Sequence, residues 1–262
     1  MGAGLPRETA HEIGTERHGG ARIGAKANGA SVCRSLGTGV WITHMTTGRL
    51  DPTLYLIADA GVCGPSAMPG IVAAAAANGT TMVQLRDKEG STGRLVDTVR
   101  ELREVLAGTG VPLLINDRVD VALAGDANGV HLGQSDMTPE DARALLGLDA
   151  LIGLTVRTRE EAARMPHGVV DYVSIGGIFP TATKNVRERP IGLEGLARLA
   201  AILDGPVVAI SGIDETNAAE VIATGVDGIA VSSAICAAED PGAVSARLAA
   251  IVARARQERE LQ

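Results

Sequence analysis

Residues 112–132 read PLLINDRVDVALAGDANGVHL, two short apolar runs with a longer segment between them. The runs Pro112–Ile115 and Gly129–Leu132 have the length and aliphatic content of buried strands, and residues 119–124 carry apolar side chains at helical spacing. Because a strand, a helix and a second strand in this order form a parallel crossover unit, the stretch predicts a parallel sheet covered by helices.

The same alternation of apolar run and helical segment extends over most of the chain. Eight such units in about 205 residues, with continuous apolar strands, predict an α/β fold: a single (β/α)8 or TIM barrel over residues 49–262. The predicted strands are Leu54–Ala58, Met82–Arg86, Pro112–Ile115, Gly129–Leu132, Leu151–Thr155, Tyr172–Ile175, Val207–Ile210 and Gly228–Val231. Predicted helices include Thr92–Leu106, Thr138–Leu146, Thr158–Met165, Glu215–Thr224 and a closing helix from Pro241 to about Glu258.

An open, doubly wound sheet is the alternative arrangement of these elements. The loop after the first strand, residues 59–64, reads DAGVCG and lacks the G-x-G-x-x-G fingerprint of dinucleotide-binding sheets. The pattern therefore favours the barrel.

Residues 1–48 have a different character from the rest of the chain. They are rich in glycine and scattered charge and show neither strand nor helix periodicity, so we expect a disordered N-terminal extension. Its histidines, His11, His18 and His44, are too far apart to form one metal-binding face.

A chain that starts at Met45 is expected to fold and to keep the activity of the full chain, because the extension has no pattern that would pack on the barrel. Thermal unfolding and turnover of the two chains, measured side by side, check this. A shorter chain that failed to fold or lost activity would give the extension a role.

Composition excludes several classes of protein. The net charge of −7 and an aromatic share of 2% argue against a nucleic-acid surface, which needs clustered basic residues and stacking rings. No apolar run reaches the roughly 20 residues that span a bilayer. The three cysteines, Cys33, Cys63 and Cys236, match no disulfide or zinc spacing, so we expect a soluble protein of the reducing cytoplasm.

Polar residues gather where the predicted strands end, the edge at which parallel barrels carry their active sites. The second strand leads into Gln84-Leu85-Arg86-Asp87-Lys88, the third into Asn116-Asp117, the fourth into residues 133–136, and the fifth ends at Thr155. Lysine is rare in this chain, yet Lys88 and Lys184 both follow strands, where an ammonium can bind phosphate as a point charge.

Asp117 and Asp136 follow neighbouring strands of the predicted barrel. Two carboxylates without a nearby histidine or cysteine suit Mg²⁺, which is commonly held by one or two carboxylates and substrate phosphate oxygens. The alternative is that each aspartate caps the helix that follows it, Val119–Ala124 or Thr138–Leu146. Spacing alone does not separate these interpretations.

The last two strands end in a pattern typical of phosphate binding by backbone amides, with Gly212 after one and Val231-Ser232-Ser233 after the other. The loop Pro180–Lys184 adds two hydroxyls and an ammonium. His131 lies within an apolar strand, which favours a hydrogen-bonded core histidine over a catalyst, and Cys63 and Cys236 are expected only to pack.

Six blocks of the sequence together resemble the thiamine phosphate synthase family, in order from about Leu54 to Val252. The blocks are QLRDK (84–88), ND (116–117), GVHLGQSD (129–136), FPTATK (179–184), GLEGL (192–196) and VSS (231–233). The two departures are Thr155, where the family often has serine and which keeps the hydroxyl, and Arg118, a position that varies.

The resemblance implies that the chain condenses an aminopyrimidine methyl diphosphate with a thiazole phosphate, or its carboxylated form, and releases diphosphate. It assigns catalytic roles to Arg86 and Lys184, and Mg²⁺ binding to Asp117 and Asp136. The implied pyrimidine diphosphate contacts are Gln84, Leu85, Arg86, Asp87, Lys88, Asn116, Thr155 and Lys184. The implied thiazole phosphate contacts are Thr181, Ala182, Thr183, Gly212, Val231 and Ser232.

Two other functions remain to be compared with this one. Thiazole tautomerase, a sister family, places a catalytic histidine where this chain has Gly177, and proton transfer needs a titratable group. A non-catalytic barrel that only binds a thiamine precursor would be indicated by loss of Lys184 or of either aspartate, and all three are present. The sequence leaves open the oligomeric state, including a homo-oligomer.

Overall fold

The structure is a computed structural model that describes Met1, residues 50–180 and residues 189–261. The predicted extension, Met1 excepted, and the predicted site residues Thr181, Ala182, Thr183 and Lys184 lie outside the described residues.

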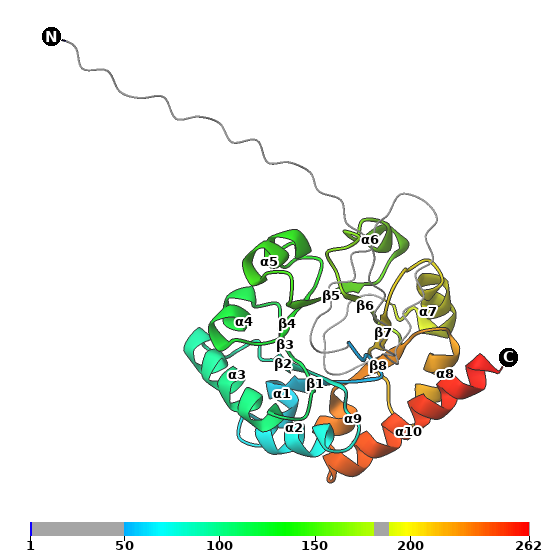
Figure 1. Ribbon diagram of the computed structural model, residues 1–262. Helices are drawn as coiled ribbons and strands as arrows, with labels where there is room; N and C mark the ends of the chain where they lie inside the picture. The colour runs from blue at the N-terminus through cyan, green and yellow to red at the C-terminus, as the bar shows by residue number, and fades with distance from the viewer. Residues whose placement is uncertain (2–49, 181–188, 262) are drawn as a thin grey trace, which may run out of the picture. The chain divides into compact units, whose positions relative to one another are not determined.

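Within the described ranges, eight parallel strands pair in sequence order, and β8 pairs with β1 to close a barrel (Figure 1). The closed barrel confirms the predicted fold and excludes the open sheet. The strands are β1 (Leu54–Asp59), β2 (Met82–Arg86), β3 (Leu113–Asn116), β4 (Gly129–Leu132), β5 (Leu151–Val156), β6 (Tyr172–Gly176), β7 (Val207–Ile210) and β8 (Gly228–Val231).

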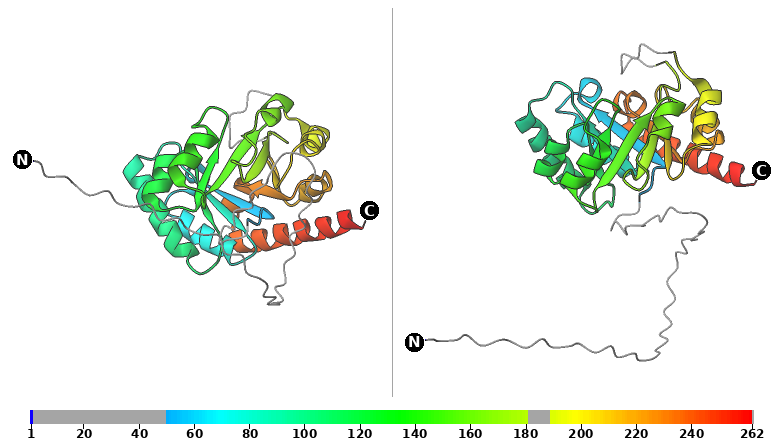
Figure 2. Two further views of the ribbon diagram at one scale, coloured as in Figure 1. Left: turned by 45° about the horizontal axis from the view of Figure 1, so that its top comes forward. Right: turned by 90° about the horizontal axis from the view of Figure 1, so that it is seen from above.

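Helices form a ring outside the strands (Figure 1). They are α1 (Ala60–Cys63), α2 (Met68–Ala76), α3 (Thr92–Leu106), α4 (Val119–Gly125), α5 (Pro139–Leu146), α6 (Arg159–Ala163), α7 (Gly192–Ala200), α8 (Ala218–Ala223), α9 (Ser233–Cys236) and α10 (Pro241–Glu260). The long helix α10, red in Figure 2, packs against both α2 and α8 and so closes the ring. None of these described helices is long and apolar enough to cross a membrane.

The element boundaries fall within one to three residues of the predicted ones. α8 begins at Ala218 rather than Glu215 because the residues before it form a turn held by side chains. Within that turn, the Thr216 backbone N–H donates to Asp214 Oδ1 over 2.8 Å, and the Asp214 N–H donates to Asn217 Oδ1 over 3.0 Å. These bonds satisfy the backbone in a conformation that competes with helix.

Strand residues alternate between two cores. On β1, Leu54 and Leu56 belong to the core between sheet and helices, whereas Tyr55 and Ile57 belong to a smaller core inside the barrel. The inner positions become polar toward the carboxyl end of the strands, where Asp59 follows on β1. This change from an apolar floor to a polar mouth positions the site.

Candidate active site

A cavity of about 430 Å³ lies at the carboxyl ends of the strands. Its walls include polar inward-facing residues from β1 to β6 on one side, and the Ser211–Asp214 and Ser232–Ala234 segments after β7 and β8 on the other. Seven of the predicted site residues line it: Gln84, Arg86, Asn116, Thr155, Gly212, Val231 and Ser232.

The five residues at the end of β2 divide between cavity and surroundings. Gln84 and Arg86 line the cavity, but Leu85, between them, is buried in the outer core, as strand alternation requires. Arg86 Nη1 forms an ion pair with Asp59 Oδ2, and the two side chains are 19% and 7% exposed. The Arg86 guanidinium is therefore held at the cavity wall by a buried carboxylate.

Asp59 is a cavity residue that the sequence interpretation did not assign. Its Oδ1 also accepts from the Gly61 N–H over 2.9 Å and caps α1. The same carboxylate therefore contacts both the start of α1 and the Arg86 guanidinium. Its place as the last inward residue of the first strand is the signal that identifies it.

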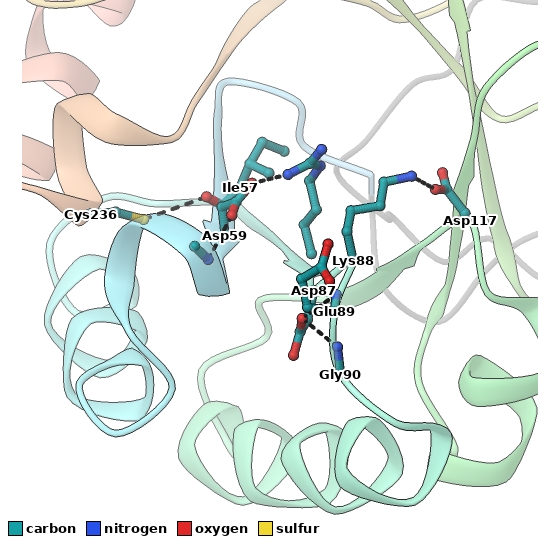
Figure 3. A network of polar contacts seen from close by, with 10 residues as sticks. Ile57, Asp59, Asp87, Lys88, Glu89, Gly90, Asp117 and Cys236 are labelled. Carbon is teal, nitrogen blue, oxygen red and sulfur yellow. Dashed lines mark hydrogen bonds and ion pairs between the residues drawn. The ribbon is translucent and has the colours of Figure 1, made fainter. Parts of the chain in front are cut away.

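Asp87 and Lys88 turn in different directions (Figure 3). Asp87 Oδ1 accepts from the backbone N–H groups of Glu89 and Gly90 over 2.9 and 2.8 Å, which orders the loop after β2. Lys88 extends to Asp117, and its Nζ forms an ion pair with Asp117 Oδ2 (Figure 3). Neither side chain lines the cavity, but Lys88 brings a positive charge to the predicted metal carboxylate.

Asp117 and Asp136 lie close enough for their carboxyl groups to interact directly. Burial raises the pKa of Asp117, but hydrogen bonds with Lys88 and Asp136 outweigh burial and leave this pKa below its usual value. Burial, followed by the hydrogen bond with Asp117, raises the pKa of Asp136. Its Oδ2 also accepts from the Gly133 N–H over 2.7 Å, which acts against this rise. The pair thus places two carboxyl groups side by side, next to the Lys88 ammonium.

Neither aspartate is the N-cap of the helix that follows it, so the capping alternative is wrong for both. The N-cap of α4 is Arg118, without a capping side-chain bond, and Asp117 has a left-handed φ of 62°. The N-cap of α5 is Thr138, whose hydroxyl accepts from the Asp141 N–H over 3.2 Å.

The two carboxylates fit a hard divalent cation. Oxygen ligands from one or two carboxylates are what Mg²⁺ commonly takes from protein, with the remainder from water and substrate. In the described part of the chain, no group of three or more His, Cys, Asp or Glu side chains is arranged to hold a metal ion. Asp117 and Asp136 would hold such a cation, with water and substrate oxygens as its other ligands.

The wall at β7 and β8 consists largely of backbone and small side chains. Ser211 and Gly212 both have left-handed φ angles, 108° and 67°. A Cβ on Gly212 would lie 2.6 Å from the Pro180 carbonyl oxygen, so only glycine allows this close approach. Ser232 precedes α9, whose first backbone N–H groups begin beside the cavity.

A chain of hydrogen-bonded side chains crosses the cavity floor. Gln84 Nε2 donates to Tyr55 OH over 2.6 Å, and Tyr55 OH lies 2.9 Å from Tyr172 OH. His131 Nδ1 lies 2.8 Å from Tyr172 OH, and His131 Nε2 lies 2.7 Å from Thr155 Oγ1. His131 is buried and hydrogen-bonded, which confirms the predicted core histidine, yet it also lines the cavity.

Position 177 does not favour the histidine of the tautomerase hypothesis, because its backbone angle would strain a side chain and the Arg157 guanidinium would have to move. Gly177 has a φ of 77°, and a Cβ there would lie 2.6 Å from Arg157 Nη2. Arg157 itself lines the cavity and is a cationic residue that the sequence interpretation missed.

The thiols of Cys63 and Cys236 are free and lie next to each other behind β1. Cys236 Sγ donates to the Ile57 carbonyl oxygen over 3.5 Å (Figure 3). Cys63 forms a hydrogen bond with Cys236, and this bond, followed by burial, raises the pKa of the Cys63 thiol. Cys63 is therefore not an activated nucleophile.

Comparison with known proteins agrees with this geometry. Residues 54–235 match the model of the family described as thiamine monophosphate synthase. The thiamine-phosphate synthase of Agrobacterium fabrum is 48% identical over 192 residues, which cover 71% of this chain and 87% of that protein. That of Chloroflexus aurantiacus is 43% identical over 203 residues, 78% of this chain and 94% of the relative. The structure of the Pyrococcus furiosus thiamine phosphate pyrophosphorylase superposes with a TM-score of 0.71 at 38% identity and covers 79% of this chain and 98% of that one.

Proposed function

The chain belongs to the thiamine monophosphate synthase family, and we propose that its cavity joins an aminopyrimidine methyl diphosphate to a thiazole phosphate, releasing diphosphate and thiamine phosphate. The observation that carries the proposal is the division of the cavity into two unlike walls. One wall holds Arg86 and Asn116, of which Asn116 contacts Asp117 of the aspartate pair, and the other exposes backbone around Gly212 and Ser232. Two phosphorylated substrates need two such walls.

The pyrimidine diphosphate is assigned to the wall formed by β2 to β5. Arg86, ion-paired at its far side with Asp59, presents its remaining N–H groups to the phosphate oxygens. Asn116 and Thr155 line the same side of the cavity and contact the substrate as neutral hydrogen-bonding groups.

The thiazole phosphate is assigned to the opposite wall. Backbone N–H groups at Gly212 and at the start of α9 bind its phosphate, together with Thr181, Ala182 and Thr183 from the loop outside the described residues. Its ring nitrogen then faces the pyrimidine methylene carbon across the cavity.

The bond that breaks joins the pyrimidine methylene carbon to the diphosphate oxygen, and the bond that forms joins the same carbon to the thiazole nitrogen. The electron-rich aminopyrimidine carries the developing positive charge, so no nucleophile from the protein is required. Arg86 stabilises the negative charge that grows on the departing diphosphate. Lys184, outside the described residues, is assigned the same task from its sequence position.

Asp117 and Asp136 are the residues that would hold Mg²⁺. When bound, this ion neutralises diphosphate oxygens and so makes diphosphate a better leaving group. Lys88 keeps Asp117 ionised by direct pairing, which maintains a ligand ready for the cation. We further propose that the protein acts in the cytoplasm on these small molecules.

Incubation of the full chain with both substrates, with and without Mg²⁺, tests the proposal. We expect thiamine phosphate and diphosphate in equal amounts, and only with Mg²⁺ present. Isomerisation of the thiazole without the pyrimidine would instead indicate a tautomerase. Binding of either substrate without turnover would indicate a carrier.

A further inference from the structure

The hydrogen-bonded chain on the cavity floor joins five side chains from five strands. It begins at Gln84 and ends at Thr155, both of which line the cavity, and passes through Tyr55, Tyr172 and His131. Both tyrosines are 1% exposed. The chain therefore connects two cavity groups through the interior of the barrel.

The first bond has a fixed direction, and the protons beyond it can be arranged so that every later bond runs the same way. Gln84 Nε2 can only donate, so Tyr55 OH accepts from it and can give its own proton to Tyr172 OH. In this arrangement Tyr172 OH gives its proton to His131 Nδ1, which makes Nδ1 an acceptor and leaves the hydrogen of a neutral imidazole on Nε2.

The same arrangement sets the role of Thr155. In it His131 Nε2–H donates to Thr155 Oγ1, so this oxygen serves as an acceptor toward the imidazole and its proton is available for the cavity. Burial raises the pKa of both tyrosines, which therefore remain O–H donors at neutral pH.

We propose that the protons of this chain have this arrangement and so fix the hydrogen-bond polarity of the cavity, with Gln84 Oε1 as acceptor and the Thr155 hydroxyl as donor. The cavity thereby selects a 4-aminopyrimidine over a 4-oxopyrimidine. A 4-aminopyrimidine presents an N–H donor beside a ring-nitrogen acceptor, which complements this pair. A 4-oxopyrimidine presents the reverse, a carbonyl beside a ring N–H. The inference rests on the proposed function for the identity of the ligand.

The packing around the chain keeps its members in place. The rings of Tyr55 and Tyr172 meet edge to face, with centroids 5.8 Å apart and an interplanar angle of 79°. A Cβ at position 153 would overlap the Tyr172 ring and lie 2.5 Å from His131 Nδ1, so Gly153 provides the space for their contact. Tyr55, Tyr172 and His131 are thus positioning residues rather than catalytic ones.

The test compares binding of the 4-amino-2-methyl-5-hydroxymethylpyrimidine diphosphate with binding of its 4-oxo counterpart, by calorimetry with Mg²⁺ and without thiazole phosphate. The wild-type chain is expected to prefer the amino ligand by about 100-fold, since the reversed ligand leaves both cavity groups mismatched. In Tyr172→Phe the two ends are uncoupled, and the preference is expected to fall to about 10-fold or less.

Ser245→Ala provides the matched control. Ser245 Oγ is buried and lies 2.8 Å from Thr80 Oγ1, outside the cavity lining. Its loss therefore breaks a buried hydrogen bond between two hydroxyls and leaves the chain on the cavity floor intact. This variant should keep the wild-type preference. Tyr55→Phe, which breaks the chain one bond nearer Gln84, should behave as Tyr172→Phe does.

The tautomer of His131 gives a second measurement that needs no core variant. Nitrogen-15 NMR of the wild-type imidazole should show the hydrogen on Nε2 and a bare Nδ1. A hydrogen on Nδ1 would overturn the proposal, because the chain would then run the other way.

The outcomes separate this inference from the proposed function. If the wild-type chain makes thiamine phosphate but Tyr172→Phe and Tyr55→Phe keep the full amino preference, the polarity inference fails and the function stands. If the wild-type chain makes no thiamine phosphate under any condition, the proposed function is wrong. The polarity inference is then wrong as well if the wild-type chain also shows no preference for the amino ligand.

Discussion

Arg86→Ala is expected to lower kcat/KM for the pyrimidine diphosphate by about 10³-fold, which corresponds to about 4 kcal/mol of transition-state stabilisation. Arg86 is the cationic predicted site residue that lines the cavity within the described part of the chain. In the proposed reaction its charge would act on the leaving diphosphate in a partly dehydrated site, where electrostatic stabilisation is strongest. Steady-state kinetics of diphosphate release measure the effect.

The same substitution is expected to destabilise the fold, because it leaves Asp59 buried without its guanidinium. The cost is about 2 kcal/mol, the penalty typical of a buried group that loses its hydrogen-bonded partner. In Arg86→Ala combined with Asp59→Asn no buried charge remains, so the thermal midpoint should recover while the activity does not.

Arg143→Ala is the matched control for loss of a half-buried arginine. Arg143 Nη2 pairs with Asp171 Oδ2 over 2.8 Å, and the side chains are 15% and 32% exposed, but neither residue lines the cavity. This variant should lose stability and keep kcat/KM. Arg86→Lys should recover part of the activity, since an ammonium restores the charge without the planar fork. An Arg86→Ala enzyme with wild-type kcat/KM would remove Arg86 from the mechanism.

The order of the barrel could be predicted because buried parallel strands and amphipathic helices leave strong patterns. β2, β4, β7 and β8 begin and end where the apolar runs do. Boundaries differ where side chains compete with helix, as at Asp214 and Asn217 before α8. Such local bonds depend on geometry that the spacing of apolar residues does not report.

The candidate site was less predictable, because neighbouring residues of one sequence motif point to opposite faces of a strand. The motif at residues 84–88 groups Leu85 and Asp87 with Gln84 and Arg86, but only the latter two line the cavity. The partner of Lys88 is also invisible in the sequence, since Asp117 lies 29 positions away on the next strand end.

The floor network escaped prediction for a related reason. Tyr55 and Tyr172 lie within apolar strands and look like ordinary core residues, 117 positions apart. Closure of the barrel brings their hydroxyls together, and only the register of β1 and β6 around the ring determines that they meet. In the composition they are only two of very few aromatic residues, which says nothing about their contact.

Asp117→Ala and Asp136→Ala are each expected to lower turnover by about 10²-fold and to weaken its dependence on Mg²⁺. Each variant removes one of two adjoining carboxylates, and the negative charge that the pair concentrates is what would draw a cation to this edge of the barrel. Turnover as a function of Mg²⁺ concentration is the measurement. Binding of thiazole phosphate should survive, because its proposed wall lies at β7 and β8.

Asp120→Ala is the matched control for this pair. Asp120 lies three residues after Asp117, on α4, and pairs with Arg118 at an exposed position, with Nη2 and Oδ2 2.6 Å apart. Its removal should leave the Mg²⁺ titration unchanged. Lys88→Ala distinguishes the effect of the Lys88 charge from that of the two carboxylates. It removes the ammonium next to Asp117 but keeps both carboxylates, so the Mg²⁺ requirement should persist. An unchanged Mg²⁺ titration in both aspartate variants would mean that the pair serves only to order the loops after β3 and β4.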